Sequence, residues 1–436
     1  MIRTGASCAA LLALLLGTPA ASRAHSSINV QGIPPAAAAS AGFDAEAATQ
    51  AYMATVPAAD KARSDAYFEG GTWLLLWNFV ASAAIYLLLL AAGWSARMRD
   101  VAERATRFRP VHVMVYWAQL ALVTALLSFP LTVYQSFFRE HRYGLATQTF
   151  GAWMGDQAKG LALSVVLGGL FVGALYAVLG RAHRTWWIWG SAVTLAFLML
   201  GALIAPVYIA PVFNTYTTLD DPSVADPILS MARANGIPAS EVYVMDASRQ
   251  TTRVSANVSG FLGTERITLN DNLLNRATLP EIEAVMGHEM GHYVLNHAYK
   301  MLLFFGVLLV IVFALLYRVS AWALDRWGAT WGVRGVDDPA GLPLLALIIA
   351  VIFFVLTPVT NNFIRTQEYE ADIFGLNAAR QPDGMALVSI KLGEYRKLDP
   401  GALEEILFFD HPSGRTRIFA SMRWKAEAAG PDTLRR

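Results

Sequence analysis

The chain has 436 residues, of which 55% are hydrophobic and 15% charged, and its mean hydropathy is +0.41. A soluble chain of this length would carry more charge, so the composition predicts a mainly α-helical, polytopic membrane protein. The formal net charge of +1 gives no indication of a nucleic-acid partner.

Residues 1–24 have the features of a signal peptide. Arg3 precedes an apolar run of about a dozen residues from Cys8, and Ser22-Arg23-Ala24 offers a cleavage site. An uncleaved N-terminal membrane anchor is the alternative. Cys8 lies ahead of the apolar run, which argues against a lipoprotein anchor, and as the only cysteine it excludes an internal disulfide. We expect residues 25–66 to form a mobile leader, because most of this segment is rich in alanine and has few large apolar side chains.

Six long apolar stretches follow, each near the length that a helix needs to cross a bilayer. Tryptophans cluster at the start of the fourth stretch, as interfacial anchors do. Four stretches predict an N-terminal membrane region over residues 67–211, and two more fall in residues 301–360. The stretches are Thr72–Gly93, Met114–Tyr134, Leu161–Gly180, Trp186–Pro206, Met301–Leu316 and Leu342–Val359.

The more polar residues 212–300 and 361–436 predict a compartment outside the lipid, which contains a small β-sheet. Its strands are expected at Glu241–Asp246, Thr252–Ser259 and, after a turn at Gly263-Thr264-Glu265, Arg266–Leu269. An extended substrate could add as a strand to the edge of this sheet. We expect Ser255, Ala256 and Asn257 on that edge. An ordinary hairpin without a ligand is equally consistent with the sequence.

A metal-binding helix is predicted at His288-Glu289-Met290-Gly291-His292. Residues four apart share one helix face, so both imidazoles can reach a single cation. The pattern is typical of a zinc site in which Glu289 acts as general base on a water molecule. Thr278, Pro280 and Glu281 indicate a capped helix start just upstream.

A third protein ligand is expected from Glu368-Tyr369-Glu370-Ala371-Asp372, directly after the last apolar stretch. Glu368 and Asp372 share a helix face, so one carboxylate can bind the metal while the other orients a ligand histidine. Glu370 points elsewhere. Charged residues on a helix are usually a solvated face, but carboxylates beside an apolar span need a compensating partner. One zinc ion is therefore the predicted cofactor.

Several further motifs occur in a fixed order along the chain. They are Lys61-Ala62-Arg63, Phe138–Gly144, Tyr208–Pro211, Val254–Gly260, the metal helix, Arg365 with residues 368–372, and His411-Pro412 followed by Arg417. With these motifs, most of residues 61–425 resembles the type I CAAX prenyl endopeptidases. Those proteins are integral-membrane zinc metalloproteases that process prenylated proteins.

The resemblance implies a ring of tilted transmembrane helices around a chamber, capped by a gluzincin-type protease domain. It also implies that Glu368 is the third ligand, with Asp372 and Arg365 in supporting positions. His411 would steady the oxyanion of the tetrahedral intermediate, and Arg417 would support the same region. The chain departs from the family at Ser255, where Asn is usual, and at Ser413, where Pro is usual.

We therefore expect a metalloendopeptidase whose partners are the bilayer and a peptide or protein substrate, with lipid-modified or membrane-inserted substrates included. In a bacterial-type chain the role would be processing or quality control of membrane or exported proteins. A transporter would instead carry ionisable residues within its spans. A non-catalytic scaffold would lack the base, whereas Glu289 is present.

The loops on the far side of the membrane from the metal helix are rich in arginine, which predicts that they are cytoplasmic. A cleaved signal followed by six spans leads to the same orientation, with the active site in the periplasm and the spans in a bacterial inner membrane. The family resemblance implies a cytosolic active site instead. The arginines are Arg97, Arg99, Arg104, Arg107, Arg109, Arg181, Arg184, Arg326 and Arg334.

Overall fold

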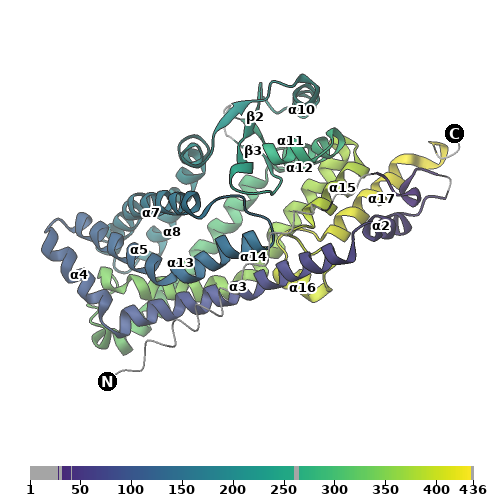
Figure 1. Ribbon diagram of the computed structural model, residues 1–436. Coiled ribbons are helices and arrows are strands. Elements are labelled where there is room, and N and C mark those ends of the chain that lie inside the picture. Colours follow the sequence, from purple (N-terminus) through teal and green to yellow (C-terminus); the bar gives the residue numbers. More distant parts are fainter. Residues whose placement is uncertain (1–27, 29–31, 41, 260–264, 434–436) are drawn as a thin grey trace.

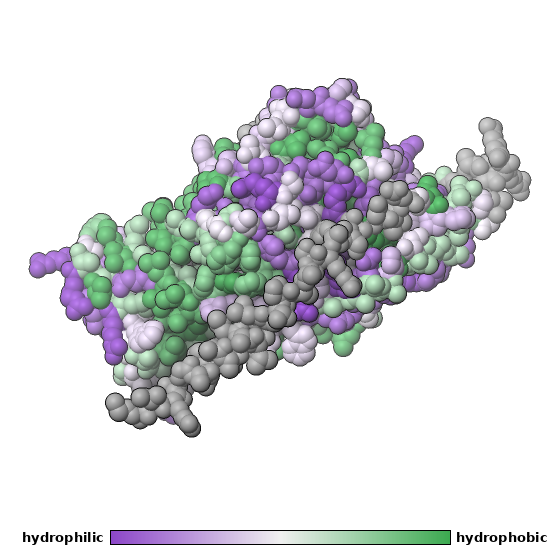
Figure 2. Space-filling view, viewed as in Figure 1, coloured by the Kyte–Doolittle hydropathy of each residue, from purple (hydrophilic) through white to green (hydrophobic). Residues whose placement is uncertain are grey.

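The computed structural model describes residues 28, 32–40, 42–259 and 265–433. The expected signal peptide (1–24) and Gly263-Thr264 of the expected turn lie outside these residues. A block of long helices makes up most of the molecule, and a small sheet and shorter helices stand on one side of it (Figure 1). Hydrophobic side chains cover much of the long-helix block, and hydrophilic ones gather around the sheet (Figure 2).

Six helical stretches are long and apolar enough to cross a membrane, which confirms the six predicted spans. Each is longer than its apolar sequence. The spans are α3 (Ala58–Ala91); α5 (Arg109–Val133) with η2 (Tyr134–Phe138) and α6 (Arg139–Arg142); α7 (Phe150–Leu179); α8 (Trp186–Ile204) with η3 (Ala205–Ile209) and α9 (Ala210–Phe213); α13 (His297–Trp331); and η5 (Pro339–Gly341) with α14 (Leu342–Ala379).

Shorter helices connect the spans or belong to the part around the sheet. Among them α4 lies at the end of the helical block farthest from α15 and α17 (Figure 1). These helices are η1 (Pro35–Ala37), α2 (Ala45–Ala54), α4 (Trp94–Ala105), α10 (Pro222–Ala234), η4 (Ala247–Arg249), α11 (Asp271–Arg276), α12 (Leu279–Val294), α15 (Pro382–Leu392), α16 (Ala402–Phe408) and α17 (Gly414–Thr433).

The expected mobile leader is wrong for the residues from Ala45 onward. Asp44 caps α2 by accepting a hydrogen bond from the Glu46 backbone N–H at 2.8 Å. Tyr52 on this helix is completely buried and donates a hydrogen bond to Asp383 at 2.8 Å. The helix packs against α15 and α17. An alanine-rich helix can approach its partners closely, so few large apolar side chains are needed to hold it.

The sheet has four strands in the order β1-β2-β4-β3. Strands β2 and β4 are parallel, whereas β1 and β3 pair antiparallel with their neighbours. The three expected strands are present, and β1 is an addition that the sequence did not indicate. Among the described residues β3 therefore forms one edge. The strands are β1 (Tyr216–Thr218), β2 (Val242–Met245), β3 (Ala256–Ser259) and β4 (Arg266–Asn270).

Helix α14 does not end at residue 360, where the sequence suggested a boundary between membrane and protease parts. It continues as one helix from Leu342 to Ala379 and so carries both the last span and Glu368. Hydropathy reports the environment of a segment and not the continuity of its backbone. The change from apolar to polar residues at this point therefore marks where the helix leaves the lipid.

Helices α12 and α14 cross with their backbones in contact. A Cβ atom added to Gly287 would lie 3.0 Å from the carbonyl oxygen of Gly375, and one added to Gly291 would lie 3.1 Å from the Cα of Ala371. A Cβ on Gly375 would lie 2.7 Å from the backbone nitrogen of His288. Only small residues allow this approach, which brings the carboxylates of α14 against the histidines of α12.

We expect Gly375→Ala to lower the free energy of unfolding by about 1–3 kcal/mol, because the added methyl group overlaps the backbone of α12. Metal content should fall with it, since the two helices carry different ligands. Gly155→Ala in α7 makes the same chemical change where a Cβ meets nothing within 4 Å. Thermal unfolding in detergent compares the two, and equal melting temperatures would show that the crossing tolerates a side chain.

Candidate active site

Three side chains converge on one point between α12 and α14. The Nε2 atoms of His288 and His292 lie 3.1 Å apart, and they lie 3.3 and 3.4 Å from the two carboxylate oxygens of Glu368. All three donor atoms lie within 4.8 Å of one another. His288 and Glu368 are buried and His292 is partly buried. Two imidazoles and one carboxylate are the donor set of a catalytic zinc site, so these residues fit a metal ion.

Asp372 and Arg417 support this triad from behind. The Nδ1 atom of His288 lies 2.8 Å from Asp372 Oδ1, which orients the ring so that its Nε2 faces the other donors. Arg417 donates a hydrogen bond to Glu368 Oε2 at 3.1 Å, and its Nε lies 2.9 Å from Asp372 Oδ2. The arginine thereby balances the charge of two carboxylates that are both buried.

A second supporting chain, which the sequence reasoning missed, runs through His297. Its Nδ1 shares a hydrogen bond with Nδ1 of His292 at 2.9 Å, and its Nε2 lies 3.1 Å from Glu370 Oε2. Lys300 donates to the same carboxylate at 2.6 Å. Glu370 thus points away from His288 and Glu368, as expected, yet it is linked to His292 through His297. The sequence signal was a histidine five residues after His292, across a helix break.

The surroundings shift the pKa values of the two histidines in opposite directions. Burial and the neighbouring His288 lower the pKa of His292 to about 4, so this imidazole is neutral and ready to bind a cation. Burial also opposes the charge on His288, but its contacts with Asp372 and Glu368 outweigh this and raise the pKa to about 9. A proton must therefore leave His288 when a metal binds.

Glu289 lies on α12 between the two histidines and is partly buried. Burial raises the pKa of Glu289 to about 7. A group with a pKa near neutrality can both accept and donate a proton at physiological pH, as a general base and acid must.

His411 also reaches the site, from the loop between α16 and α17. Its Nε2 lies 3.2 Å from Glu368 Oε2, and its Nδ1 lies 2.7 Å from Asp410 Oδ1. Arg365 does not contact the three convergent side chains. It donates hydrogen bonds to the backbone oxygens of Glu405 and Phe409 at the end of α16, and so holds the loop that carries His411.

The edge strand β3 packs against the metal helix α12. Ser255 and Asn257 are exposed, and Ala256 is partly buried. Ser255 lies just before the strand, with its backbone N–H bonded to the side chain of Asn270 at 3.1 Å. The predicted edge residues therefore lie on or beside a strand that contacts the helix of His288 and His292, and β3 has no further strand beside it among the described residues.

A His-His-Glu cluster with an adjacent carboxylate, in which the glutamate lies on a membrane-spanning helix, defines a membrane-embedded metallopeptidase rather than a transporter. Residues 45–215 match the family model described as CAAX prenyl protease N-terminal, five membrane helices, and residues 218–425 match peptidase family M48. Within 45–215 the structure has four helices of membrane-spanning length and composition. The chain belongs to peptidase family M48 and is a membrane metalloendopeptidase.

Individual relatives agree with this assignment. The chain is 30% identical to YhfN of Bacillus subtilis, described as an uncharacterized metalloprotease, over 77% of this chain and 79% of that protein. It is 28% identical to CAAX prenyl protease 1 of Saccharomyces cerevisiae, over 69% of this chain and 70% of that protein. The crystal structure of S. mikatae Ste24p has the same fold, with a TM-score of 0.71 at 21% identity over 84% of this chain and 89% of that one.

Replacing His297 by alanine should weaken metal affinity about ten- to a hundredfold, because His292 then loses the partner that orients its ring. Glu370→Ala, one contact further out, should retain the metal and have the smaller effect. Competition with a chelator measures both. The exposed His183, in the loop after α7, supplies the control His183→Ala. Unchanged affinity in His297→Ala would mean that this contact does not orient the ligand.

Proposed function

We propose that His288, His292 and Glu368 hold one zinc ion and that the protein cleaves peptide bonds with it. The convergence of the three donors within 4.8 Å is the observation that carries this proposal. Zinc bound there would act as a Lewis acid that polarises the scissile carbonyl and makes a nearby water more acidic.

In this proposal Glu289 takes the proton from the attacking water and later delivers it to the leaving amine. Its position beside both histidines and its pKa of about 7 suit both steps. His411, which Asp410 orients through Nδ1, donates from Nε2 to the oxyanion as negative charge develops there. Arg417 holds Glu368 and Asp372 and so maintains the geometry of the site.

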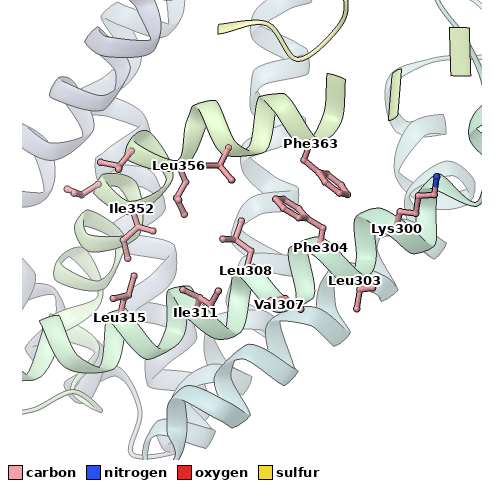
Figure 3. A pocket seen from close by; sticks show the side chains of 13 residues that line it. Lys300, Leu303, Phe304, Val307, Leu308, Ile311, Leu315, Ile352, Leu356 and Phe363 are labelled. Carbon is pink, nitrogen blue, oxygen red and sulfur yellow. The ribbon is translucent and has the colours of Figure 1, made fainter. Parts of the chain in front are cut away.

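The substrate would bind as an extended strand along β3, beside Ser255, Ala256 and Asn257, with its backbone hydrogen-bonded to the groups of β3 that face away from β4. An apolar cavity of about 870 Å³ between α13 and α14 supports a substrate that is lipid-modified or membrane-inserted (Figure 3). Two of the residues that line this cavity, Lys300 and Phe363, are only three and five residues away in the sequence from His297 and Glu368, respectively. We propose processing or quality control of membrane or exported proteins in a bacterial inner membrane.

Glu289→Ala should retain zinc and lose peptidase activity by several orders of magnitude, since the base is not a ligand. Glu368→Ala should lose both zinc and activity. Metal analysis of purified protein, together with cleavage of a library of quenched peptides, tests the pair. A wild-type cleavage rate in Glu289→Ala would contradict the mechanism. Equal zinc content in the two variants would show that Glu368 is not the third ligand.

His411→Ala should reduce kcat by about a hundredfold or more with little change in KM, because the side chain acts on the transition state. Its zinc content should match that of the wild type. Loss of zinc would instead make His411 a ligand, and unchanged kinetics would leave it without a catalytic role.

We propose a periplasmic active site on the basis of the arginines in the loops opposite α12. Nine arginines lie in or beside those loops, against Arg139 and Arg142 in α6 and Lys159 in the first part of α7 on the side of α12. Several of the nine pair with acidic residues, as Arg99 does with Asp338 at 2.6 Å, but acidic residues contribute little to the orientation rule.

A reporter that is active only after export should therefore be active when fused after Arg436 and silent when fused after Arg104. A cytoplasmic reporter at the same positions provides the reciprocal control. The reverse pattern would put the active site in the cytosol, and residues 8–20 would then be an uncleaved additional span.

A further inference from the structure

Among the described residues, one cation near the site, Arg396, forms no ion pair. Arg396 lies in the segment between α15 and α16, and its carbonyl oxygen accepts a hydrogen bond from Ser64 of α3 at 3.2 Å. The adjacent Lys397 forms ion pairs with Glu69 and Glu404 at 2.8 and 3.0 Å. Among the described residues no carboxylate lies within ion-pair distance of the Arg396 guanidinium.

The Arg396 side chain is not a freely solvated surface group. It is enclosed by protein and only partly accessible, and burial, followed by the nearby charge of Arg417, lowers its pKa. The charges of Asp410 and Glu368 also reach it. An enclosed guanidinium remains charged and is usually paired, so its lack of an anion is costly unless a ligand supplies one.

Arg396 also borders the edge strand, through Tyr395. The Arg396 guanidinium carbon lies 5.9 Å from the centre of the Tyr395 ring. The Tyr395 hydroxyl donates to the carbonyl oxygen of Val254 at 3.4 Å, directly before the predicted substrate edge. Arg396 is therefore close both to the Asp410-His411 loop and to the N-terminal end of β3.

Strand direction then decides which end of a peptide comes near Arg396. Strand β3 runs from Ala256 to Ser259, so Val254 lies two residues before its first residue. A peptide that adds antiparallel to β3 runs in the opposite direction, and its C-terminal part lies beside Val254 and Tyr395. The anionic groups that such a peptide can present there are its terminal carboxylate and the side chains of Asp and Glu.

We propose that Arg396 binds a carboxylate of the substrate on the C-terminal side of the scissile bond. The guanidinium can donate hydrogen bonds to both carboxylate oxygens in a bidentate pair, which gives directional recognition as well as charge. Arg396 would thus determine specificity and take no part in bond cleavage. This inference rests on the proposed peptidase function and on antiparallel addition of the substrate to β3.

Three versions of the best-cleaved quenched peptide test the proposal: one with a free C-terminal carboxylate, one with a C-terminal amide, and one with the amide and a terminal glutamate. Wild-type enzyme should prefer the free acid over the amide about ten- to a hundredfold in kcat/KM, mainly through KM. Arg396→Gln should abolish this preference, and Arg396→Lys should restore part of it. If the third peptide is cleaved as efficiently as the free acid, Arg396 recognises a carboxylate at this position whether it belongs to the C-terminus or to a side chain.

Two controls separate this inference from the peptidase proposal. Arg233→Gln removes the same charge from an exposed position on α10 and should keep the preference. Arg396→Gln should also keep its zinc content and cleave the amide peptide at the wild-type rate. Equal cleavage of acid and amide by the wild type, or an intact preference in Arg396→Gln, would overturn the assignment while the peptidase function stands. Failure of the wild type to cleave any peptide would overturn both.

Discussion

The direct backbone contact between α12 and α14 is the constraint on which the rest of the site depends. One helix carries His288 and His292, and the other carries Glu368, so the spacing of the donors is set by how closely two separate helices approach. Glycine at 287 and 375 permits an approach that any larger residue would prevent. Because α14 is also a membrane span, the His-His-Glu cluster and the transmembrane region share one continuous helix.

Much of this arrangement could be predicted from local sequence patterns. Helical periodicity alone puts His288 with His292, and Glu368 with Asp372, on common faces, because the spacing of four residues is a property of the helix itself. Long apolar stretches likewise identified the six spans. These predictions succeeded because each depends on residues within one element and on its nearest environment.

Contacts between elements were harder to predict. His297 reaches His292 only because Asn296 adopts a left-handed conformation (φ 58°) that turns the chain between α12 and α13. Arg365 was expected beside the metal ligands, but its hydrogen bonds to the end of α16 depend on tertiary packing that no local pattern reports. The burial of Tyr52 against the C-terminal helices escaped prediction for the same reason, since its partners lie more than 300 residues away.

The uninterrupted course of α14 fixes the distance between the apolar stretch and Glu368. Glu368 follows Val359, the last residue of the apolar stretch, by nine residues, which corresponds to about 14 Å along a helix axis. Glu368 therefore lies at most this length, along one continuous helix, from the end of the apolar stretch. A polypeptide tethered at the level of Val359 would have to extend by roughly four residues before one of its bonds reached Glu368. For such a polypeptide, distance from the tether would limit which bond is within reach, in addition to side-chain chemistry.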